Sequence, residues 1–369
     1  MKINKAFKYR IYPNKEQLTL IHKTFGCTRF VFNRFLNQRI ELYKNEEKST
    51  TYVNQAKELT ALKKDLTWLK EVDSVSLQSA LRNLDTAFKN FFQKRAKYPR
   101  FKSKRNNIKS YTTKNTNNSI RIEGSMLKFP KLGLLKTKFH REIPRNHKIL
   151  SATISQVPTG AYFVSITTEF EKEIIQVPSN GNIVGLDFSM KELFVSSENQ
   201  RAKYPRFFRM LEAKLIKAQR KLSRMVRFSN NWYKQKTKVA RIHYKIKNSR
   251  SDFLHKLSTQ LVNKYNAIAI EDLNMKGMSQ ALKFGKSVSD NGWGMFIAML
   301  KYKAELRGKQ LVKIDRFYPS SKTCSICGAV KKDLKLSERV YTCECGNSID
   351  RDLNASINIK NQGKLLLQY

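Results

Sequence analysis

The chain has 369 residues, of which 72 are Lys or Arg and 29 are Asp or Glu, so its formal net charge is +43. This length allows two or three domains, and a body this basic needs a polyanion, most obviously nucleic acid, to offset its self-repulsion. A ribosomal or membrane-surface protein is the alternative, but the absence of any apolar run as long as a membrane span speaks against a membrane protein. The first residues carry no signal-peptide core, which predicts a reducing compartment for the cysteines.

The first half of the chain combines a helical unit with short strands. Alternating residues predict a strand that stops at Pro13, and apolar residues at helical spacing predict helices within 15–46 and 74–94. Beyond a basic segment with interleaved aromatic residues, further strands are predicted at 119–122, 126–129, 135–139, 149–155 and 162–168. We therefore expect a small barrel or sandwich, with the helical unit inserted after its first strand.

The second half alternates strands with long basic helices. Buried strands are predicted at 183–188, 192–197, 266–270 and 311–317, and apolar stripes within 211–225 and 239–261 predict two helices whose outer faces carry Lys and Arg. A last helix is predicted at 352–360. This order of elements is that of a ribonuclease H-type nuclease, a mixed sheet with helices and with acids at its strand ends.

Four of the five cysteines lie in one short stretch: Cys324, Cys327, Cys343 and Cys345. Two close pairs separated by a hairpin-length gap are typical of a tetrahedral zinc site, and four thiolates leave no open coordination position, so the predicted zinc is structural. Four buried thiols are the alternative. Cys27 stands alone and is predicted to be a packed small side chain.

Three carboxylates occupy positions at which a second metal site is expected. Asp187 lies in a buried strand, Glu271 directly follows another, and Asp352 heads the last helix. A carboxylate in an apolar strand is costly unless it is paired or binds a metal. If the three converge, they would hold two Mg²⁺ ions about 4 Å apart for phosphodiester hydrolysis.

Other interpretations of these acids remain open. Each one alone is compatible with a salt bridge or a helix cap, and Asp350 in particular with an N-cap of the last helix. Asp272 and Asp315 are substitutes with the character of solvent-facing or salt-bridged groups.

Seven motifs, in order along nearly the whole chain, resemble the TnpB proteins of bacterial insertion sequences, compact RNA-guided nucleases related to type V CRISPR effectors. They are KAFKYRIYP at 5–13, GCTRFVFN at 26–33, PRFKSK at 99–104, GLDF at 185–188, IEDLN at 270–274, YPSSKTCSICG at 318–328 and DRDLNA at 350–355. The last three are specific in combination, whereas each of the first ones is weak by itself.

The resemblance implies a multidomain α+β and α/β fold. Its parts would be a wedge β-barrel (1–19 and 96–180), a helical recognition lobe (20–95), a RuvC-like nuclease domain (181–319 and 347–369) and a zinc-ribbon insert (320–346). It assigns Asp187, Glu271 and Asp352 as magnesium ligands, with Asp350 as the fallback. The pair Cys343 and Cys345 is one residue shorter than the usual spacing, which leaves the ribbon geometry open.

The resemblance also implies the partners and the activity. One chain would bind a guide RNA transcribed from the transposon end and cut matched double-stranded DNA beside a short element-specific motif, in the bacterial cytoplasm and at the nucleoid. The alternatives are a nuclease-inactive RNA-guided repressor, against which the presence of all three acids speaks, and a strand-transferring transposase, which the zinc insert and the recognition lobe fit less well.

Overall fold

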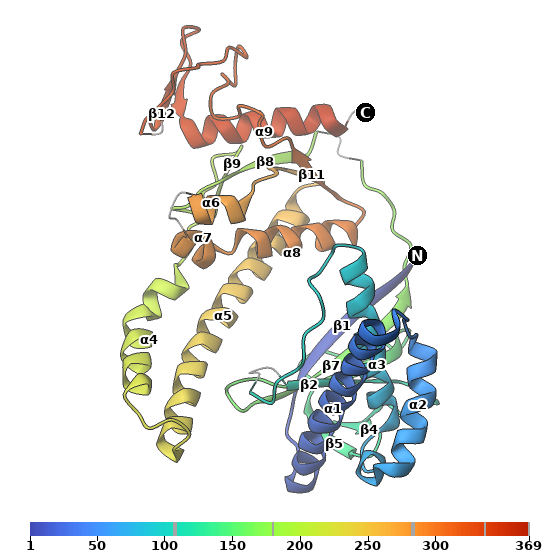
Figure 1. The fold of residues 1–369 in the computed structure, drawn as a ribbon. Coiled ribbons are helices and arrows are strands. Elements are labelled where there is room, and N and C mark those ends of the chain that lie inside the picture. Colours follow the sequence, from blue (N-terminus) through green and yellow to red (C-terminus); the bar gives the residue numbers. More distant parts are fainter. Residues whose placement is uncertain (106–108, 179–180, 282–284, 336, 368–369) are drawn as a thin grey trace. The chain divides into compact units, whose positions relative to one another are not determined.

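The computed structural model describes residues 1–105, 109–178, 181–281, 285–335 and 337–367 (Figure 1). They form two compact units, residues 1–172 and 173–369, each with its own core. The predicted boundary at residue 180 lies outside the described residues. None of the helices in the described part combines the length and the apolar character needed to cross a membrane.

The first unit is built on a seven-stranded sheet in which every neighbouring pair is antiparallel. Its strands are β1 (Lys2–Ile11), β2 (Lys109–Lys114), β3 (Arg121–Glu123), β4 (Met126–Phe129), β5 (Gly133–Lys138), β6 (Lys148–Gln156) and β7 (Tyr162–Glu171), in the order β2-β6-β7-β1-β5-β4-β3. β1 pairs with β7 along its whole length, so the first strand completes a sheet whose other members follow the helices, as the sequence predicts. β2 was not predicted, because KSYTTK offers little apolar alternation.

Three helices form the inserted helical part of this unit: α1 (Lys15–Glu46), α2 (Tyr52–Asp65) and α3 (Ser74–Phe92), with a 3₁₀ turn η1 (Thr67–Lys70) between the last two. α1 begins at a capping box between Asn14 and Gln17. The start of α1 packs Ile21 and Phe25 onto the sheet, whereas its later turns pack against α2 and α3. Cys27 is buried in that helical core, which confirms its predicted role.

The second unit is a four-stranded sheet between layers of helices. The strands β8 (Ile183–Phe188), β9 (Phe194–Ser196), β10 (Ala267–Glu271) and β11 (Gln310–Ile314) have the order β11-β10-β8-β9. β8, β10 and β11 are parallel, and β9 is antiparallel to β8. The helices are α4 (Phe207–Ser223), α5 (Asn230–Lys264), α6 (Met275–Ala281), α7 (Gly285–Asn291), α8 (Trp293–Glu305) and α9 (Arg351–Leu367).

Two-residue alternation along β8 and β10 assigns each side chain to one face of this sheet. Val184, Leu186, Ile268 and Ile270 share a core with residues of α5 and α8. The intervening positions Ile183, Ala267 and Ala269 pack with Ile359 of α9 on the opposite face. Figure 1 shows α8 and α9 on opposite sides of these strands.

Two further features differ from the sequence prediction. β11 ends at Ile314 rather than at residue 317, because Asp315 begins a turn in which it accepts hydrogen bonds from the backbone N–H groups of Phe317 and Tyr318. α8 was not predicted. The small sheet of β12 (Val340–Thr342) and β13 (Ser348–Asp350) leads directly into α9 and lies beside the cysteines.

Candidate metal centres

Asp187 and Glu271 stand at the carboxyl ends of two adjacent parallel strands. The register pairs Ile270 with Leu186, so Glu271 and Asp187 are the next residues along β10 and β8. Alternation directs both side chains to the face that carries Ile183 and Ala269, which α9 covers. Asp352 lies in the first turn of α9, so all three predicted acids belong to this face of the sheet.

Two glycines let α9 lie directly on the sheet. A Cβ at Gly185, in β8, would stand 2.1 Å from the backbone oxygen of Ser356 and 2.5 Å from the backbone nitrogen of Lys360. A Cβ at Gly363, in α9, would stand 2.5 Å from the Cβ of Ala269. Glycine within a strand marks such a close approach of another backbone, and this signal was available in the GLDF motif.

The electrostatics of the acids reflect their burial and their proximity. Burial raises the pKa of Asp187 well above its usual range, and the charges of Glu271 and Asp352 raise it further. Burial also raises the pKa of Glu271 and, together with the charge of Asp350, that of Asp352. In the described structure the carboxylates of Asp187 and Asp352 have no hydrogen-bond or ion-pair partner, although both side chains keep some exposure to solvent. The charge of Arg351 lowers the pKa of both aspartates, and the charges of Arg339 and Arg201 lower that of Asp352, without offsetting the rise. A divalent cation would stabilise the ionised carboxylates further.

Asp350 has a different role from Asp352. One of its carboxylate oxygens accepts hydrogen bonds from the backbone N–H groups of Asp352 and Leu353, each at 3.0 Å. Asp350 therefore caps the start of α9. Its other oxygen lies 3.0 Å from a guanidinium nitrogen of Arg201. The cap interpretation of Asp350 is thus confirmed by its hydrogen bonds.

The loop after β11 connects Glu271 to the cysteine region. The hydroxyl of Ser320 donates a hydrogen bond to Glu271, and the side-chain amide of Asn358 in α9 donates to the backbone oxygens of Ser320 (2.8 Å) and Thr323 (2.6 Å). The amide of Asn354 also donates to the oxygen of Thr323, at 2.7 Å. Ser320 and Asn358 were not singled out from the sequence. The asparagines at positions 354 and 358, four residues apart in the predicted last helix, are the signal that could have found Asn358.

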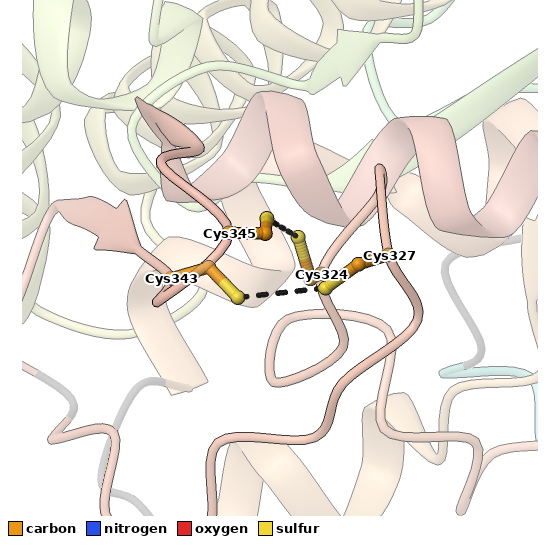
Figure 2. Close-up of side chains that lie close together, drawn as sticks. All are labelled: Cys324, Cys327, Cys343 and Cys345. Atoms are coloured by element: carbon orange, nitrogen blue, oxygen red, sulfur yellow. Dashed lines mark hydrogen bonds between the residues drawn. The ribbon is translucent and has the colours of Figure 1, made fainter.

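The four cysteines converge as predicted, and Figure 2 shows their side chains directed at one another. All four Sγ atoms lie within 4.8 Å of one another, and Cys324–Cys345 and Cys327–Cys343 are each 3.6 Å apart. Tetrahedral zinc with Zn–S bonds of about 2.3 Å requires sulfur–sulfur separations of about 3.8 Å. The short Cys343–Cys345 spacing therefore does not prevent a tetrahedral arrangement.

Hydrogen bonds around the cluster favour the thiolate at Cys324 but not at Cys345. At Cys345 the backbone N–H of Asn347 lowers the pKa, but hydrogen bonds with the other three cysteines and burial raise it to about 12. Burial opposes ionisation of Cys324, but backbone N–H groups of the cysteine loop and the side-chain amide of Asn347 lower its pKa to about 6. The Asn347 amide nitrogen lies 3.4 Å from the Cys324 sulfur. Within the part of the chain that the structure describes, these cysteines are the only group of three or more such ligands spaced this closely.

Profiles of three families match successive parts of the chain. The IS605 OrfB family, described as "Probable transposase", matches residues 165–282, and the Cas12f1-like TNB domain matches residues 293–359, which include all four cysteines. A helix-turn-helix domain of IS605 OrfB matches residues 1–48. In the structure those residues contain the strand β1 and the single long helix α1.

Full-length relatives cover nearly all of the chain. A Streptomyces pristinaespiralis protein named "Putative RNA-guided DNA endonuclease" is 39% identical over 360 residues, which span 97% of this chain and 89% of that protein. The InsQ protein of Escherichia coli K12, which carries the same description, is 33% identical over 385 residues, which span 100% of this chain and 94% of that protein. A Cas12f1 chain, solved by cryo-EM with its sgRNA and target DNA, shares the fold with a TM-score of 0.62 at 12% identity, and the match covers 98% of this chain and 99% of that one. On the identity and coverage of the two full-length relatives, the chain belongs to the TnpB (OrfB) family of IS605-type insertion sequences.

Proposed function

We propose that this protein is an RNA-guided DNA endonuclease, which cuts double-stranded DNA matched to a guide RNA beside a short element-specific motif. The names and coverage of the two full-length relatives support this function. The observation that carries it is the set of three acids on one face of the sheet, whose pKa values burial raises and of which Asp187 and Asp352 form no ion pair in the described structure. A guided repressor has no need for such a set.

Asp187, Glu271 and Asp352 would hold two Mg²⁺ ions. When bound, magnesium supplies an activated water and charge stabilisation at the leaving oxygen of a phosphodiester. The strand ends fix Asp187 and Glu271, the Ser320 hydroxyl orients Glu271, and the Asp350 cap fixes the turn of α9 that carries Asp352.

The domains would divide this work as the family resemblance implies. Residues 1–19 and 96–180 would form the wedge barrel, 20–95 the recognition lobe, 181–319 and 347–369 the RuvC-like nuclease, and 320–346 the zinc ribbon near the target strand. With a net charge of +43, the protein would hold the guide and the heteroduplex through phosphates and A-form shape, while base pairing reads the target sequence. We place this activity in the bacterial cytoplasm, where thiols stay reduced and available to zinc.

The test uses the full chain purified with the RNA transcribed from its native flanking DNA. With Mg²⁺ present, the wild type should cut a guide-matched duplex, and Asp187→Ala should bind that duplex and leave it intact. Full cutting by Asp187→Ala would refute the metal role. Binding without any cutting by the wild type under several divalent metals would establish the repressor instead, and joined products would establish a strand-transferring transposase.

A further inference from the structure

Three aromatic side chains gather at the tip of the hairpin formed by α4 and α5: Phe228, Trp232 and Tyr233, hereafter the aromatic tip. Figure 1 shows α4 and α5 side by side, with their connection away from the sheet of the same unit. The ring centroids of Phe228 and Trp232 are 5.6 Å apart, and those of Trp232 and Tyr233 are 5.1 Å apart. The ammonium of Lys236 lies 4.9 Å from the centre of the Trp232 ring.

The aromatic tip is not part of a hydrophobic core. Phe228 is 62% exposed and Tyr233 is 50% exposed, whereas the core of this hairpin is formed around Leu215, Val239 and Ile246. The backbone of Phe228 has a φ of 69°, a left-handed conformation that is strained for a bulky residue. The chain thus keeps a large ring on the surface, at a position where a glycine would be unstrained.

The hairpin around the aromatic tip is positively charged throughout. Between Glu212 and Asp252 the sequence has no acidic residue, and it carries twelve Lys or Arg from Lys214 to Lys247. None of these twelve forms an ion pair within the described structure, whereas Arg250, nearer the sheet, pairs with Asp290. A surface of this charge attracts phosphates and repels a second copy of itself.

We propose that the aromatic tip stacks on unpaired bases of the guide RNA, while the flanking cations hold the adjacent phosphates. Exposed rings within a cationic surface are the usual platform for single-stranded nucleic acid, because every base has a face on which a ring can stack. RNA with loops and ends offers such bases, whereas paired bases in a duplex are already stacked. The inference rests on the proposed function, because it needs the chain to carry an RNA.

The experiment compares ring-deleting and ring-keeping variants of the full chain. Phe228→Gly combined with Tyr233→Ala should weaken binding of the co-purified RNA, re-synthesised for the assay, by about tenfold or more. The slope of log affinity against log salt should not change, because no charge is removed. Phe228→Trp should bind like the wild type, and so should Val226→Ala, which alters a 79% exposed aliphatic side chain of the same loop.

A folding defect is distinguished from a binding defect by comparing the melting temperature with the RNA affinity. Phe228→Gly alone relieves the left-handed strain, so its melting temperature should equal or exceed that of the wild type while its RNA affinity falls. Ultraviolet crosslinking followed by peptide mapping should place the RNA on residues 225–236 of the wild type. A blunt RNA duplex without loops should bind the wild type and the double variant equally.

Each remaining outcome has a defined meaning. Unchanged guide-RNA affinity in the double variant, without crosslinks at the tip, overturns the inference and leaves the proposed function intact. If the double variant loses only its binding of single-stranded DNA, the tip binds that DNA and not the guide RNA. If it loses only self-association, measured by sedimentation, the tip binds a second copy of the chain. Either result overturns the inference. Failure of the wild type to bind the RNA overturns the proposed function and, with it, this inference.

Discussion

Replacing Gly185 with alanine should lift the start of α9 from the sheet and disable the carboxylate site. The new Cβ would stand 2.1 Å from the oxygen of Ser356, and such contacts essentially never fall below 3.0 Å. Both clashing groups belong to the α9 backbone, so α9 must move by about 1 Å, at an overpacking cost of about 1–3 kcal/mol. A displacement of about 1 Å in Asp352 relative to Asp187 is expected to slow cutting about 100-fold.

The assay measures two quantities on the same preparation: the free energy of unfolding in urea and the rate of guide-directed cutting with Mg²⁺. Gly26→Ala is the matched control, because Gly26 lies within α1 and a Cβ there meets nothing within 4 Å. That substitution should raise the free energy of unfolding by about 0.5–1 kcal/mol and leave cutting unchanged. Guide-RNA binding should persist in both variants.

One result would refute this reasoning. If Gly185→Ala unfolds and cuts like the wild type, then α9 does not lie as close to β8 as Gly185 allows, and Asp352 is not positioned by that contact. A stability loss with full cutting would retain the packing argument and remove the link to the acids.

Three further predictions concern single side chains. Asp350→Ala should lower the free energy of unfolding by about 1 kcal/mol through loss of the cap. Asp352→Asn should abolish cutting and, in EDTA, leave the free energy of unfolding equal or higher, because the metal-free site disfavours the charge of Asp352. Similar losses of stability and of cutting in both variants would contradict this division of roles. Cys327→Ser should reduce bound zinc from one per chain, measured by mass spectrometry, and lower the melting temperature; a zinc-free wild type of normal stability would exclude the site. Burial lowers the pKa of Lys303 to about 8, against 10.5 for an unperturbed lysine, so between these pH values the unfolded chain binds more protons than the folded one. The free energy of unfolding should therefore rise with pH across this window more steeply in the wild type than in Lys303→Gln. Parallel curves for the two proteins would contradict this prediction.

The strands that carry the acids could be predicted because each is short, β-branched and buried. Ala267–Ile270 has that character, and Glu271 follows it as the first charged residue. The cysteine cluster could also be predicted, because the spacing of metal ligands is a local property of the sequence. α8 was missed because its apolar run Trp293–Leu300, which shares one core with the sheet and α5, has no clean helical period.

Contacts between distant segments were beyond sequence reasoning. The hydrogen bond from Ser320 to Glu271 joins residues 49 positions apart, and Asn358 reaches Ser320 across 38. No rule of sequence spacing predicts either contact, because whole helices or strands lie between the two residues of each pair. The role of Asp350 as a cap could be proposed because capping is local, whereas its partner Arg201 could not.

The heptapeptide Arg-Ala-Lys-Tyr-Pro-Arg-Phe, present at 95–101 and 201–207, shows this limit within one chain. In the first copy Tyr98 is 44% exposed and its ring lies 5.1 Å from that of Phe91. In the second, Tyr204 is 8% exposed and donates a hydrogen bond of 2.5 Å to the backbone oxygen of Asp290, 86 residues away. Identical local propensities thus yield a surface ring in one unit and a buried anchor in the other, because the partners come from elsewhere in the fold. An aromatic residue in a basic segment therefore becomes a candidate for base stacking only when the fold leaves it exposed, as it leaves Phe228.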